Sequence, residues 1–254
     1  MSPNTTRLQG RTALVTGSTG GLGVAIAKTL AAQGAFVVVS GRNKERGDAV
    51  VAEIRAAGGQ AGFVAADLGA GGDEVQRLAE QAVAAAGGQI DILVNNAGVW
   101  GMPEPTGEVS ERALLESYQT NVIAPFLLTG ALAPAMAERG RGAVVNVGSI
   151  TGLIGGDGSA LYSSTKAAVH SLTKSWAVEY GPRGVRVNAV APGPIATERA
   201  LEAAEHIAPV LARIPSRRMS TPEEVAAAVA FLAGEDAGNI HGVILSVDGG
   251  WAAA

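Results

Sequence analysis

The sequence contains no cysteine, and this absence excludes disulfide bonds, thiolate metal sites and a thiol nucleophile. Histidine, another common metal ligand, occurs only as His170, His206 and His241. These three residues lie too far apart in the sequence to show the short spacing of a ligand cluster. The sequence therefore predicts no metal site.

Charge is also scarce, because only 17% of the residues are charged and the formal net charge is −4. The basic residues are scattered, so the sequence has no basic patch of the kind that nucleic-acid-binding proteins carry. The first ten residues are polar and lack the apolar centre of a signal peptide. We therefore expect a cytoplasmic protein that binds no nucleic acid.

Long apolar runs are limited to one stretch, residues 117–137, which has no charged residue and is long enough to span a bilayer. Polar residues, glycine and proline interrupt it at Gln119, Asn121, Pro125, Gly130 and Pro134. We therefore expect a helix buried in the protein or at a subunit contact, and no membrane association.

Short runs rich in apolar β-branched residues alternate with alanine-rich stretches of helical length. The runs are apolar on both faces, as in a parallel sheet covered by helices on both sides. This alternation predicts an α/β fold with a doubly wound, parallel, seven-stranded sheet of the Rossmann type, and residues 1–254 are expected to form one domain. The predicted strands are 12–16, 36–40, 62–66, 91–95, 142–148, 185–190 and 242–247. The predicted helices are 22–33, 44–57, 73–86, 110–136, 162–180 and 222–233.

Residues 191–221 break this alternation with four prolines and an extra helical stretch. A segment of this kind above the strand ends is where a loop that covers a substrate is expected. We therefore predict a substrate-covering flap near residues 194–220.

A glycine-rich turn, LVTGSTGGLGVAIAKTL (14–30), leads from the first predicted strand into the first helix. Small residues let the backbone approach a pyrophosphate, and the helix N-terminus supplies amide donors. The spacing fits G-x-x-x-G-x-G through Gly17, Gly21 and Gly23, and also G-x-x-G-x-x-G through Gly17, Gly20 and Gly23. The position of the turn favours a dinucleotide site over a plain tight turn.

The second predicted strand ends in VVVSGRN (37–43). NAD sites usually place an acidic residue about 20 residues beyond the glycines, whereas NADP sites place an arginine nearby. Here Gly41 offers no carboxylate, and Arg42 is a planar donor suited to a 2′-phosphate. The sequence predicts NADP(H) as the preferred cofactor with NAD(H) as the alternative, and Gly41→Asp is expected to favour NAD(H). If Arg42 is only a loop arginine, Lys44 and Arg46 are other basic residues nearby.

Tyr162 and Lys166 lie four residues apart in a predicted helix and therefore on one face of it. Taken alone, the pair is more typical of an ordinary helix surface than of a catalytic site. Ser163 and Lys166 match the serine–lysine pair of penicillin-recognising enzymes, but the chain has no S-D-N or K-T-G partner motif.

The chain carries TGSTGGLG (16–23), ADL (66–68), NNAG (95–98), Asn121, Ser149, Tyr162, Lys166 and PGPIAT (192–197) in that order. This ordered set resembles the compact, single-domain branch of the short-chain dehydrogenase/reductase family, from about Leu8 to VDGGW (247–251). The resemblance implies an NAD(P)-dependent oxidoreductase that interconverts a small-molecule alcohol and a ketone or aldehyde by hydride transfer.

The resemblance also implies contacts with the cofactor. They are Ser18, Thr19, Gly21 and Leu22 at the phosphates, Asp67 and Leu68 at the adenine, Asn95, Ala97 and Gly98 at the middle, and Pro192, Gly193, Ile195 and Thr197 at the carboxamide. Judged from the residues alone, Asp67 is also compatible with a helix cap and Asn95-Asn96 with a turn.

For catalysis, the resemblance implies that Tyr162 moves the proton and Ser149 holds the substrate oxygen. Lys166 would hydrogen-bond the nicotinamide ribose, and Asn121 would anchor a water between Lys166 and solvent. Tyrosine has a pKa of about 10, and lowering it by ~3 units corresponds to roughly 4 kcal/mol. We expect the Lys166 ammonium to lower it, helped by the positive nicotinamide ring.

Two features depart from the family pattern. Gly20 stands where many NADP-using relatives carry a basic residue, which leaves the 2′-phosphate mainly to Arg42. After NNAG the chain continues VWGMPEP (99–105) and not the Thr-Arg-Asp-like stretch typical of 3-oxoacyl-carrier-protein reductases, so a fatty-acid role is not supported. Trp100, Leu153, Ile154 and the flap are expected to shape a moderately apolar pocket, and the sequence does not identify the substrate.

A nucleotide-sensing scaffold without turnover is an alternative from another functional class, although such proteins usually lose the tyrosine or the lysine. A methyltransferase is a further alternative, but it would have no need for the set of Ser149, Tyr162 and Lys166.

In the family, helices corresponding to residues 117–137 and to the helix of Tyr162 commonly pack across a twofold axis. We therefore expect a homotetramer, with a dimer as the second choice.

Overall fold

Seven parallel strands form one sheet in the computed structural model, which describes residues 7–100, 103–156, 158–202 and 204–253. The strand order is β3-β2-β1-β4-β5-β6-β7, so β1 lies inside the sheet and the chain winds outward from it in both directions. This is the predicted doubly wound fold. The strands are β1 (Thr12–Val15), β2 (Phe36–Gly41), β3 (Gln60–Ala65), β4 (Ile92–Asn95), β5 (Gly142–Val147), β6 (Val185–Pro192) and β7 (Ile244–Val247).

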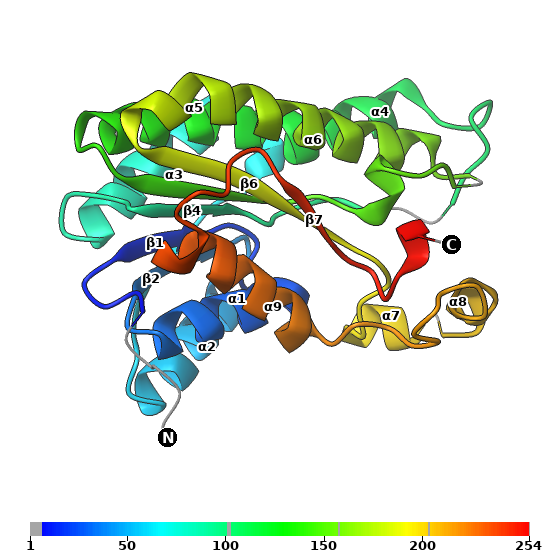
Figure 1. The fold of residues 1–254 in the computed structure, drawn as a ribbon, viewed down its shortest axis with the longest axis horizontal. Helices are drawn as coiled ribbons and strands as arrows, with labels where there is room; N and C mark the ends of the chain where they lie inside the picture. The colour runs from blue at the N-terminus through cyan, green and yellow to red at the C-terminus, as the bar shows by residue number, and fades with distance from the viewer. Residues whose placement is uncertain (1–6, 101–102, 157, 203, 254) are drawn as a thin grey trace.

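Helices cover both faces of the sheet (Figure 1). One layer holds α1 (Gly21–Ala32), α2 (Lys44–Ala56) and α9 (Pro222–Ala233), and the other holds α3 (Gly72–Ala85), α5 (Ala124–Glu138) and α6 (Ala160–Tyr180). Leu14 and Val15 are both fully buried, one against each layer, which explains why the strands are apolar on both faces.

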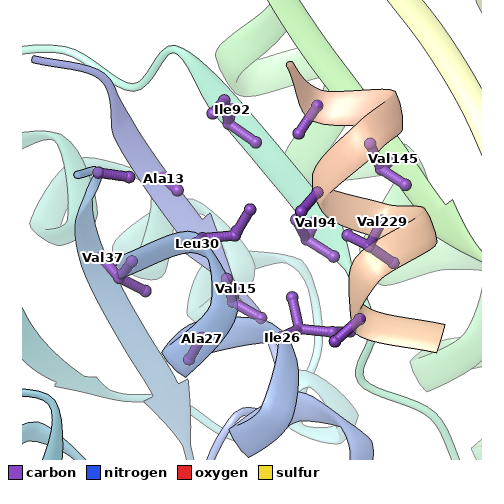
Figure 2. Close-up of a cluster of buried hydrophobic side chains, with 14 of the residues drawn as sticks. Ala13, Val15, Ile26, Ala27, Leu30, Val37, Ile92, Val94, Val145 and Val229 are labelled. Atoms are coloured by element: carbon purple, nitrogen blue, oxygen red, sulfur yellow. The ribbon is translucent and has the colours of Figure 1, made fainter. Parts of the chain in front are cut away.

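The core of the first layer gathers around α1 (Figure 2). Ile26 and Leu30 of this helix lie against Val15 of β1, Val94 of β4 and Val229 of α9, and all five side chains are fully buried. Burial of a side chain such as leucine or isoleucine contributes roughly 1.5–3 kcal/mol to folding. This packing holds the N-terminus of α1 beside the carboxyl end of β1.

The predicted helix 110–136 consists of three parts: α4 (Glu111–Tyr118), a π-helical turn (Gln119–Ile123) and α5. Together, Glu111–Glu138 is long and apolar enough to cross a membrane by length and composition. Half of its most apolar window is buried inside the protein, and Leu128, Leu132 and Met136 belong to the core beneath it. This burial agrees with the predicted core helix.

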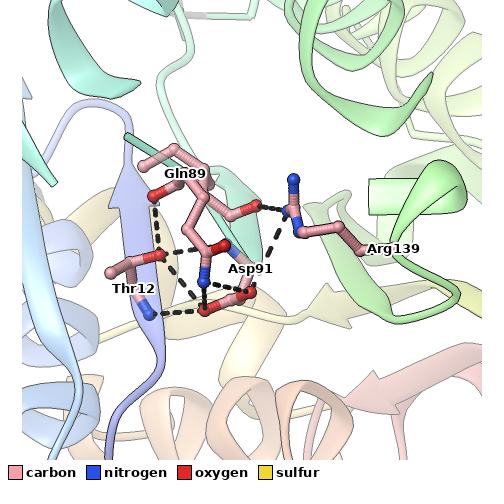
Figure 3. Close-up of polar contacts among 5 residues, drawn as sticks. Thr12, Gln89, Asp91 and Arg139 are labelled. Atoms are coloured by element: carbon pink, nitrogen blue, oxygen red, sulfur yellow. Dashed lines mark hydrogen bonds and ion pairs between the residues drawn. The ribbon is translucent and has the colours of Figure 1, made fainter. Parts of the chain in front are cut away.

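A polar cluster fixes the amino ends of β1 and β4 to each other (Figure 3). The Asp91 carboxylate is 2% exposed and accepts a hydrogen bond from the Thr12 amide at 3.1 Å. The Thr12 hydroxyl donates to the Gln89 carbonyl oxygen at 2.8 Å, and Arg139 Nη2 donates to the Ile90 carbonyl oxygen at 2.7 Å. The cluster therefore stabilises the sheet edge opposite the glycine-rich turn.

The segment between β6 and α9 contains two short helices, α7 (Glu198–Glu202) and α8 (Ala204–Leu211), beyond the carboxyl ends of β6 and β7 (Figure 1). Ala203, which lies in the predicted flap, is outside the described residues. The two ends of the segment are joined where the Ser220 amide donates to the Pro194 carbonyl and the Ala196 amide donates to the Ser220 carbonyl, each at 2.9 Å. The segment therefore leaves the fold and rejoins it at two ends that are hydrogen-bonded to each other.

Candidate active site

The glycine-rich turn packs against the NNAG segment at the carboxyl edge of the sheet. Gly17 has a φ of +62°, and a Cβ atom on it would lie 2.8 Å from the Ala97 Cα. A Cβ atom on Gly23 would lie 2.2 Å from the Gly17 carbonyl oxygen and 2.7 Å from Asn96 Nδ2 of the NNAG segment. These contacts are too short for a side chain, so the close approach of the two segments requires glycine at these positions.

The N-terminus of α1 offers free amide groups at this turn. Gly20 is the N-cap residue and no side chain caps the helix, whereas Thr221 closes a capping box at the start of α9. The first amides of a helix have no partner inside the helix and favour an anion. The turn therefore fits the pyrophosphate of a dinucleotide.

Other predicted residues meet the same edge. A Cβ atom on Gly21 would lie 3.5 Å from Thr197 Cγ2, and one on Gly98 would lie 3.4 Å from Asn121 Oδ1 and 3.5 Å from Lys166 Nζ. The structure thus brings together the glycine-rich turn, the NNAG segment, the PGPIAT segment and the helix of the Tyr–Lys pair.

The side chains of four residues predicted to contact the cofactor point into the protein. Ser18 is fully buried and its hydroxyl donates to the Val15 carbonyl at 2.7 Å. Asn95 donates to Asn146 Oδ1 at 2.8 Å, while Leu22 and Leu68 belong to the core. Only the backbone atoms of Ser18, Leu22, Leu68 and Asn95 remain available for a cofactor.

Asp67 behaves as the helix cap that the sequence left open, because its Oδ1 accepts a hydrogen bond from the Gly69 amide at 3.1 Å. It caps a short 3₁₀ turn, Leu68–Ala70, and stays exposed. Pro192 is the last residue of β6, and the Gly193 amide donates to the Val247 carbonyl of β7 at 3.1 Å. Ile195 forms a bridge with Ser220.

The basic residues after β2 differ in their partners. Lys44 donates to Asp48 at 2.5 Å, one helical turn further along α2. The exposed Arg42 forms no hydrogen bond or ion pair with the residues that the structure describes. Arg42 is therefore free to bind an anion at the end of β2.

Tyr162 and Lys166 lie on the first two turns of α6, and Lys166 is 4% exposed. Lys166 Nζ donates to the Val147 carbonyl at 2.9 Å and lies 5.5 Å from the centre of the Tyr162 ring. The Ser149 hydroxyl hydrogen-bonds the Tyr162 hydroxyl and lies 3.0 Å from the Thr151 hydroxyl. Ser149, Tyr162 and Lys166 thus form one connected group.

Burial raises the pKa of Tyr162 to about 12, against a smaller lowering by the hydrogen bond with Ser149. Burial also lowers the pKa of Lys166 to about 8. The prediction that Lys166 lowers the pKa of Tyr162 is therefore wrong for the protein alone. The physical reason is that removal from water disfavours the charged form of both groups.

Asn121 lies in the π-helical turn and is 1% exposed. Its Oδ1 accepts from the Val99 amide at 2.7 Å, and its Nδ2 donates to the Val99 carbonyl at 2.9 Å and to the Thr165 hydroxyl at 3.1 Å. The side chain therefore joins the segment after NNAG to α6, and a contact with water is left to its backbone.

Trp100 and Leu153, predicted to shape the pocket, are 37% and 45% exposed, and Ile154 is half-buried. Gly101 and Met102, in the stretch after NNAG, lie outside the described residues. Two residues further on, the Glu104 amide donates to the Gly158 carbonyl at 2.7 Å. This bond holds the stretch beside the loop that precedes Tyr162.

Sequence reasoning missed two residues that fix the site. Thr165 is fully buried and receives the hydrogen bond of Asn121, and the Ser40 amide donates to the Ser18 hydroxyl at 3.0 Å. Both contacts join segments that are far apart in the chain, so no local pattern reveals them. Serine and threonine are also so common that finding one at position 40 or 165 does not identify a site residue.

Comparison with known proteins agrees with this geometry. The family model described as short chain dehydrogenase matches residues 11–208. The chain is 41% identical to cis-4-hydroxycyclohexanecarboxylate dehydrogenase of Sinomonas cyclohexanicum over 244 residues, covering 96% of this chain and 97% of that protein. It is also 41% identical to a 3-oxoacyl-[acyl-carrier-protein] reductase of Synechocystis sp. over 251 residues, covering 96% and 98%.

A similar solved structure is a blue fluorescent protein from a metagenomic library in complex with NADPH, with a TM-score of 0.91 and 34% identity over 96% of this chain and 99% of that chain. The sheet order, the glycine-rich turn and these matches lead to one conclusion. The chain belongs to the short-chain dehydrogenase family of oxidoreductases, which use a nicotinamide cofactor.

Proposed function

We propose that the protein is an NADP(H)-dependent oxidoreductase that interconverts an alcohol and a ketone or aldehyde. The observation that carries this proposal is the connected group of Ser149, Tyr162 and Lys166 beside Gly98 and the glycine-rich turn. A scaffold without turnover would have no use for this group. Such a scaffold would bind the nicotinamide cofactor, but no alcohol or ketone added to it would change the absorbance of the nicotinamide.

The residues at the carboxyl edge would hold the cofactor along the sheet. The amides of α1 at Gly21 and Leu22 would bind the phosphates, and Ala97, Gly98 and Thr197 would line its path toward Tyr162. When bound, the nicotinamide supplies or accepts the hydride. Because the glycines of the site carry no side chains, the cofactor could lie close to the backbone.

Tyr162 would give a proton to, or take a proton from, the substrate oxygen, which Ser149 would hold by a hydrogen bond. Lys166, with a pKa of about 8, is mostly charged at neutral pH. A positive charge near the phenol favours the phenolate and therefore eases the loss of its proton. Ser149 would thus hold the substrate oxygen, Tyr162 would move the proton and Lys166 would supply the positive charge.

Arg42 would select NADP(H), because its guanidinium is free and charge-assisted hydrogen bonds to phosphate contribute about 1.5–3 kcal/mol. After allowance for solvent screening, we expect kcat/KM to favour NADPH over NADH by roughly ten- to a hundredfold, since each 1.4 kcal/mol is about tenfold. Arg42→Ala should weaken NADPH much more than NADH, whereas Arg46→Ala serves as a matched control. A wild-type preference for NADH would overturn this assignment.

The exposed apolar groups of Trp100 and Leu153 support a moderately apolar substrate. A cyclic secondary alcohol is the first candidate, since one relative is a dehydrogenase of a hydroxylated cyclohexane ring. An acyl thioester is the second, since another relative is a 3-oxoacyl reductase. A panel of cyclic alcohols, their ketones and a 3-oxoacyl thioester, assayed with both cofactors by nicotinamide absorbance, separates the two.

A further inference from the structure

Thr19 of the glycine-rich turn lies directly against Gly41 at the end of β2. A Cβ atom on Gly41 would lie 2.6 Å from Thr19 Oγ1, 2.8 Å from Thr19 Cγ2 and 3.2 Å from Thr19 Cβ. The first two distances are under 3.0 Å, closer than a Cβ atom comes to another heavy atom in real structures, so both are steric clashes. Any side chain at position 41 would have to displace Thr19.

Rotation of the Thr19 side chain does not relieve the clash. Threonine carries two heavy atoms on Cβ, and both face Gly41. Staggered rotamers offer three positions around Cβ, so each alternative rotamer still turns at least one of the two atoms toward Gly41. Relief therefore requires the backbone to move.

The backbone on both sides of the contact is fixed by hydrogen bonds. The Ser18 amide donates to the Ser40 carbonyl at 2.9 Å, and the Ser40 amide donates to the Ser18 hydroxyl at 3.0 Å. Ser18 and Ser40 are at most 2% exposed. Because these residues immediately precede Thr19 and Gly41, the two chain segments cannot separate without breaking buried hydrogen bonds, which is costly.

The Thr19 hydroxyl itself forms no hydrogen bond with the residues that the structure describes, and its side chain is half-buried. It is therefore an unused donor at the end of β2, where the unpaired Arg42 follows Gly41. A carboxylate at position 41 would have to share this space with Thr19, whereas a phosphate could meet both the hydroxyl and the guanidinium.

We propose that Thr19 is a specificity-determining residue, because its side chain keeps an acidic residue out of position 41 and so reserves the end of β2 for the 2′-phosphate of NADP(H). The inference rests on the proposed cofactor preference. It also adds a condition to one sequence-based expectation, because we now expect Gly41→Asp to favour NAD(H) only where the space of Thr19 is also released.

The steric part is tested without any cofactor, by a double-mutant cycle on thermal unfolding of the full chain. Gly41→Ala should lower Tm by about 3–8 °C in the wild-type background, as overpacking in a protein of this size does. In the Thr19→Ala background the same change should lower Tm by less than half as much. In the Thr19→Val background, which keeps both heavy atoms, the loss should match that in wild type. Equal losses in all three backgrounds would overturn the proposal.

The specificity part is tested by fluorescence titration with NADH and NADPH. Gly41→Asp alone should weaken NADPH without strengthening NADH by more than about twofold. Thr19→Ala/Gly41→Asp should shift the ratio of the two affinities toward NADH at least about tenfold further than Thr19→Val/Gly41→Asp. If Gly41→Asp alone shifts the preference fully, Thr19 has no such role.

These results are separable from the cofactor proposal. If wild type prefers NADH, the proposed NADP(H) preference fails, although the thermal cycle still reports whether Thr19 excludes a side chain at position 41. If wild type prefers NADPH but the cycle shows no coupling between positions 19 and 41, the cofactor proposal stands and the role of Thr19 fails.

Discussion

Tyr162 has a pKa of about 12 in the protein alone, further from neutral pH than the pKa of a free tyrosine. Proton transfer near pH 7 therefore depends on groups that favour the phenolate. The Ser149 hydrogen bond is one such group in the protein alone. We propose that the Lys166 ammonium, 5.5 Å from the ring centre, becomes another when the cofactor and the substrate are bound. Removal of the phenol should therefore abolish the reaction and leave the surroundings intact.

Tyr162→Phe should retain the fold and nicotinamide binding but lose turnover by about 10²–10⁴-fold, the usual contribution of general acid–base catalysis. The measurement is kcat with the best substrate of the panel, alongside a binding titration. Tyr118→Phe is a matched control, because the Tyr118 hydroxyl donates only to the exposed Ser164 hydroxyl. Retention of more than about a tenth of the wild-type rate would remove Tyr162 from its assigned role.

His170 is a second buried titratable residue, one helical turn beyond Lys166 on α6. It is 4% exposed, and neither ring nitrogen has a hydrogen-bond partner of good geometry among the described residues. A Cβ atom on Gly148 would lie 2.1 Å from His170 Nε2, and one on Gly152 would lie 2.8 Å from Cε1. The imidazole thus fills the space under the loop that carries Ser149.

Burial lowers the pKa of His170 to about 4, aided by the charges of Lys166 and Lys174 and opposed by a weak contact with the Gly152 backbone. The unfolded chain therefore binds a proton below about pH 6.5 that the folded protein takes up only near pH 4. Stability should fall as the pH falls through this window, by up to about 2–3 kcal/mol from this group.

The comparison is Tm between pH 7 and pH 4 for wild type, His170→Gln and the control His241→Gln, whose histidine is exposed. His170→Gln should flatten the acid limb of the profile, and His241→Gln should leave it unchanged. Parallel profiles for wild type and His170→Gln would mean that His170 titrates normally.

At the scale of elements, the strands could be predicted because short apolar β-branched runs end at glycine or polar residues. β3 begins two residues before its predicted start, because the polar Gln60 pairs with Phe36 at an edge where a polar side chain stays in solvent. β6 extends to Pro192 because it pairs with Val247 of β7. Such pairings are set by partners distant in the chain, so local composition does not reveal them.

The candidate site was predictable as a set of residues but not as a set of side-chain directions. Leu68 was correctly placed after its strand and Asn95 at the end of its own. The side chains of both face the core, and this direction depends on packing against distant parts of the chain, which the sequence does not show. The π-helical turn at Asn121 has no composition signal, since it changes only the hydrogen-bond spacing of the backbone. The pKa of Tyr162 depends on how deeply the side chain is buried, and this cannot be read from the sequence.

Gly20 is a position in the glycine-rich turn at which a side chain would fit. Its φ is −169°, an extended conformation open to any residue, and a Cβ atom on it would meet no atom of the described residues within 4 Å. Gly20→Arg should therefore fold normally and increase the NADPH-over-NADH ratio of kcat/KM by about two- to fivefold, the range of an exposed charge pair. Gly20→Gln, uncharged and of similar length, is the control and should leave the ratio unchanged. Equal effects of the two variants would contradict an electrostatic cause.

At the scale of the whole molecule, α4, the π-helical turn and α5 present apolar side chains outward. Leu115 is 59% exposed, Phe126 51% and Ile123 43%, and Phe126 also lines a groove of about 390 Å³ between α3 and α5. Exposed apolar groups that lie together are typical of a surface that another protein covers. Ile123 and Phe126 lie in residues 117–137, one of the two stretches that the family resemblance assigns to a subunit contact, and α6 is the other.

We expect a homotetramer in light scattering at micromolar concentration, with a dimer as the second choice. Phe126→Glu should shift the mass toward smaller species, because burial of an unpaired carboxylate in an apolar contact is costly. Leu201→Glu in α7, at a site that is 55% exposed, is the control and should keep the wild-type mass. A monomeric wild type would contradict the assembly.

The position of β1 has a consequence for synthesis of the chain. β1 pairs with β2 on one side and with β4 on the other, so Ala13 faces Val37 and also Ile92. During translation β1, β2 and β3 emerge first, and one edge of β1 stays unpaired until residues 66–91 have followed. An unpaired, apolar strand edge invites association with other chains. The nascent chain therefore carries an apolar, unpaired edge of β1, open to association with other chains, until β4 leaves the ribosome.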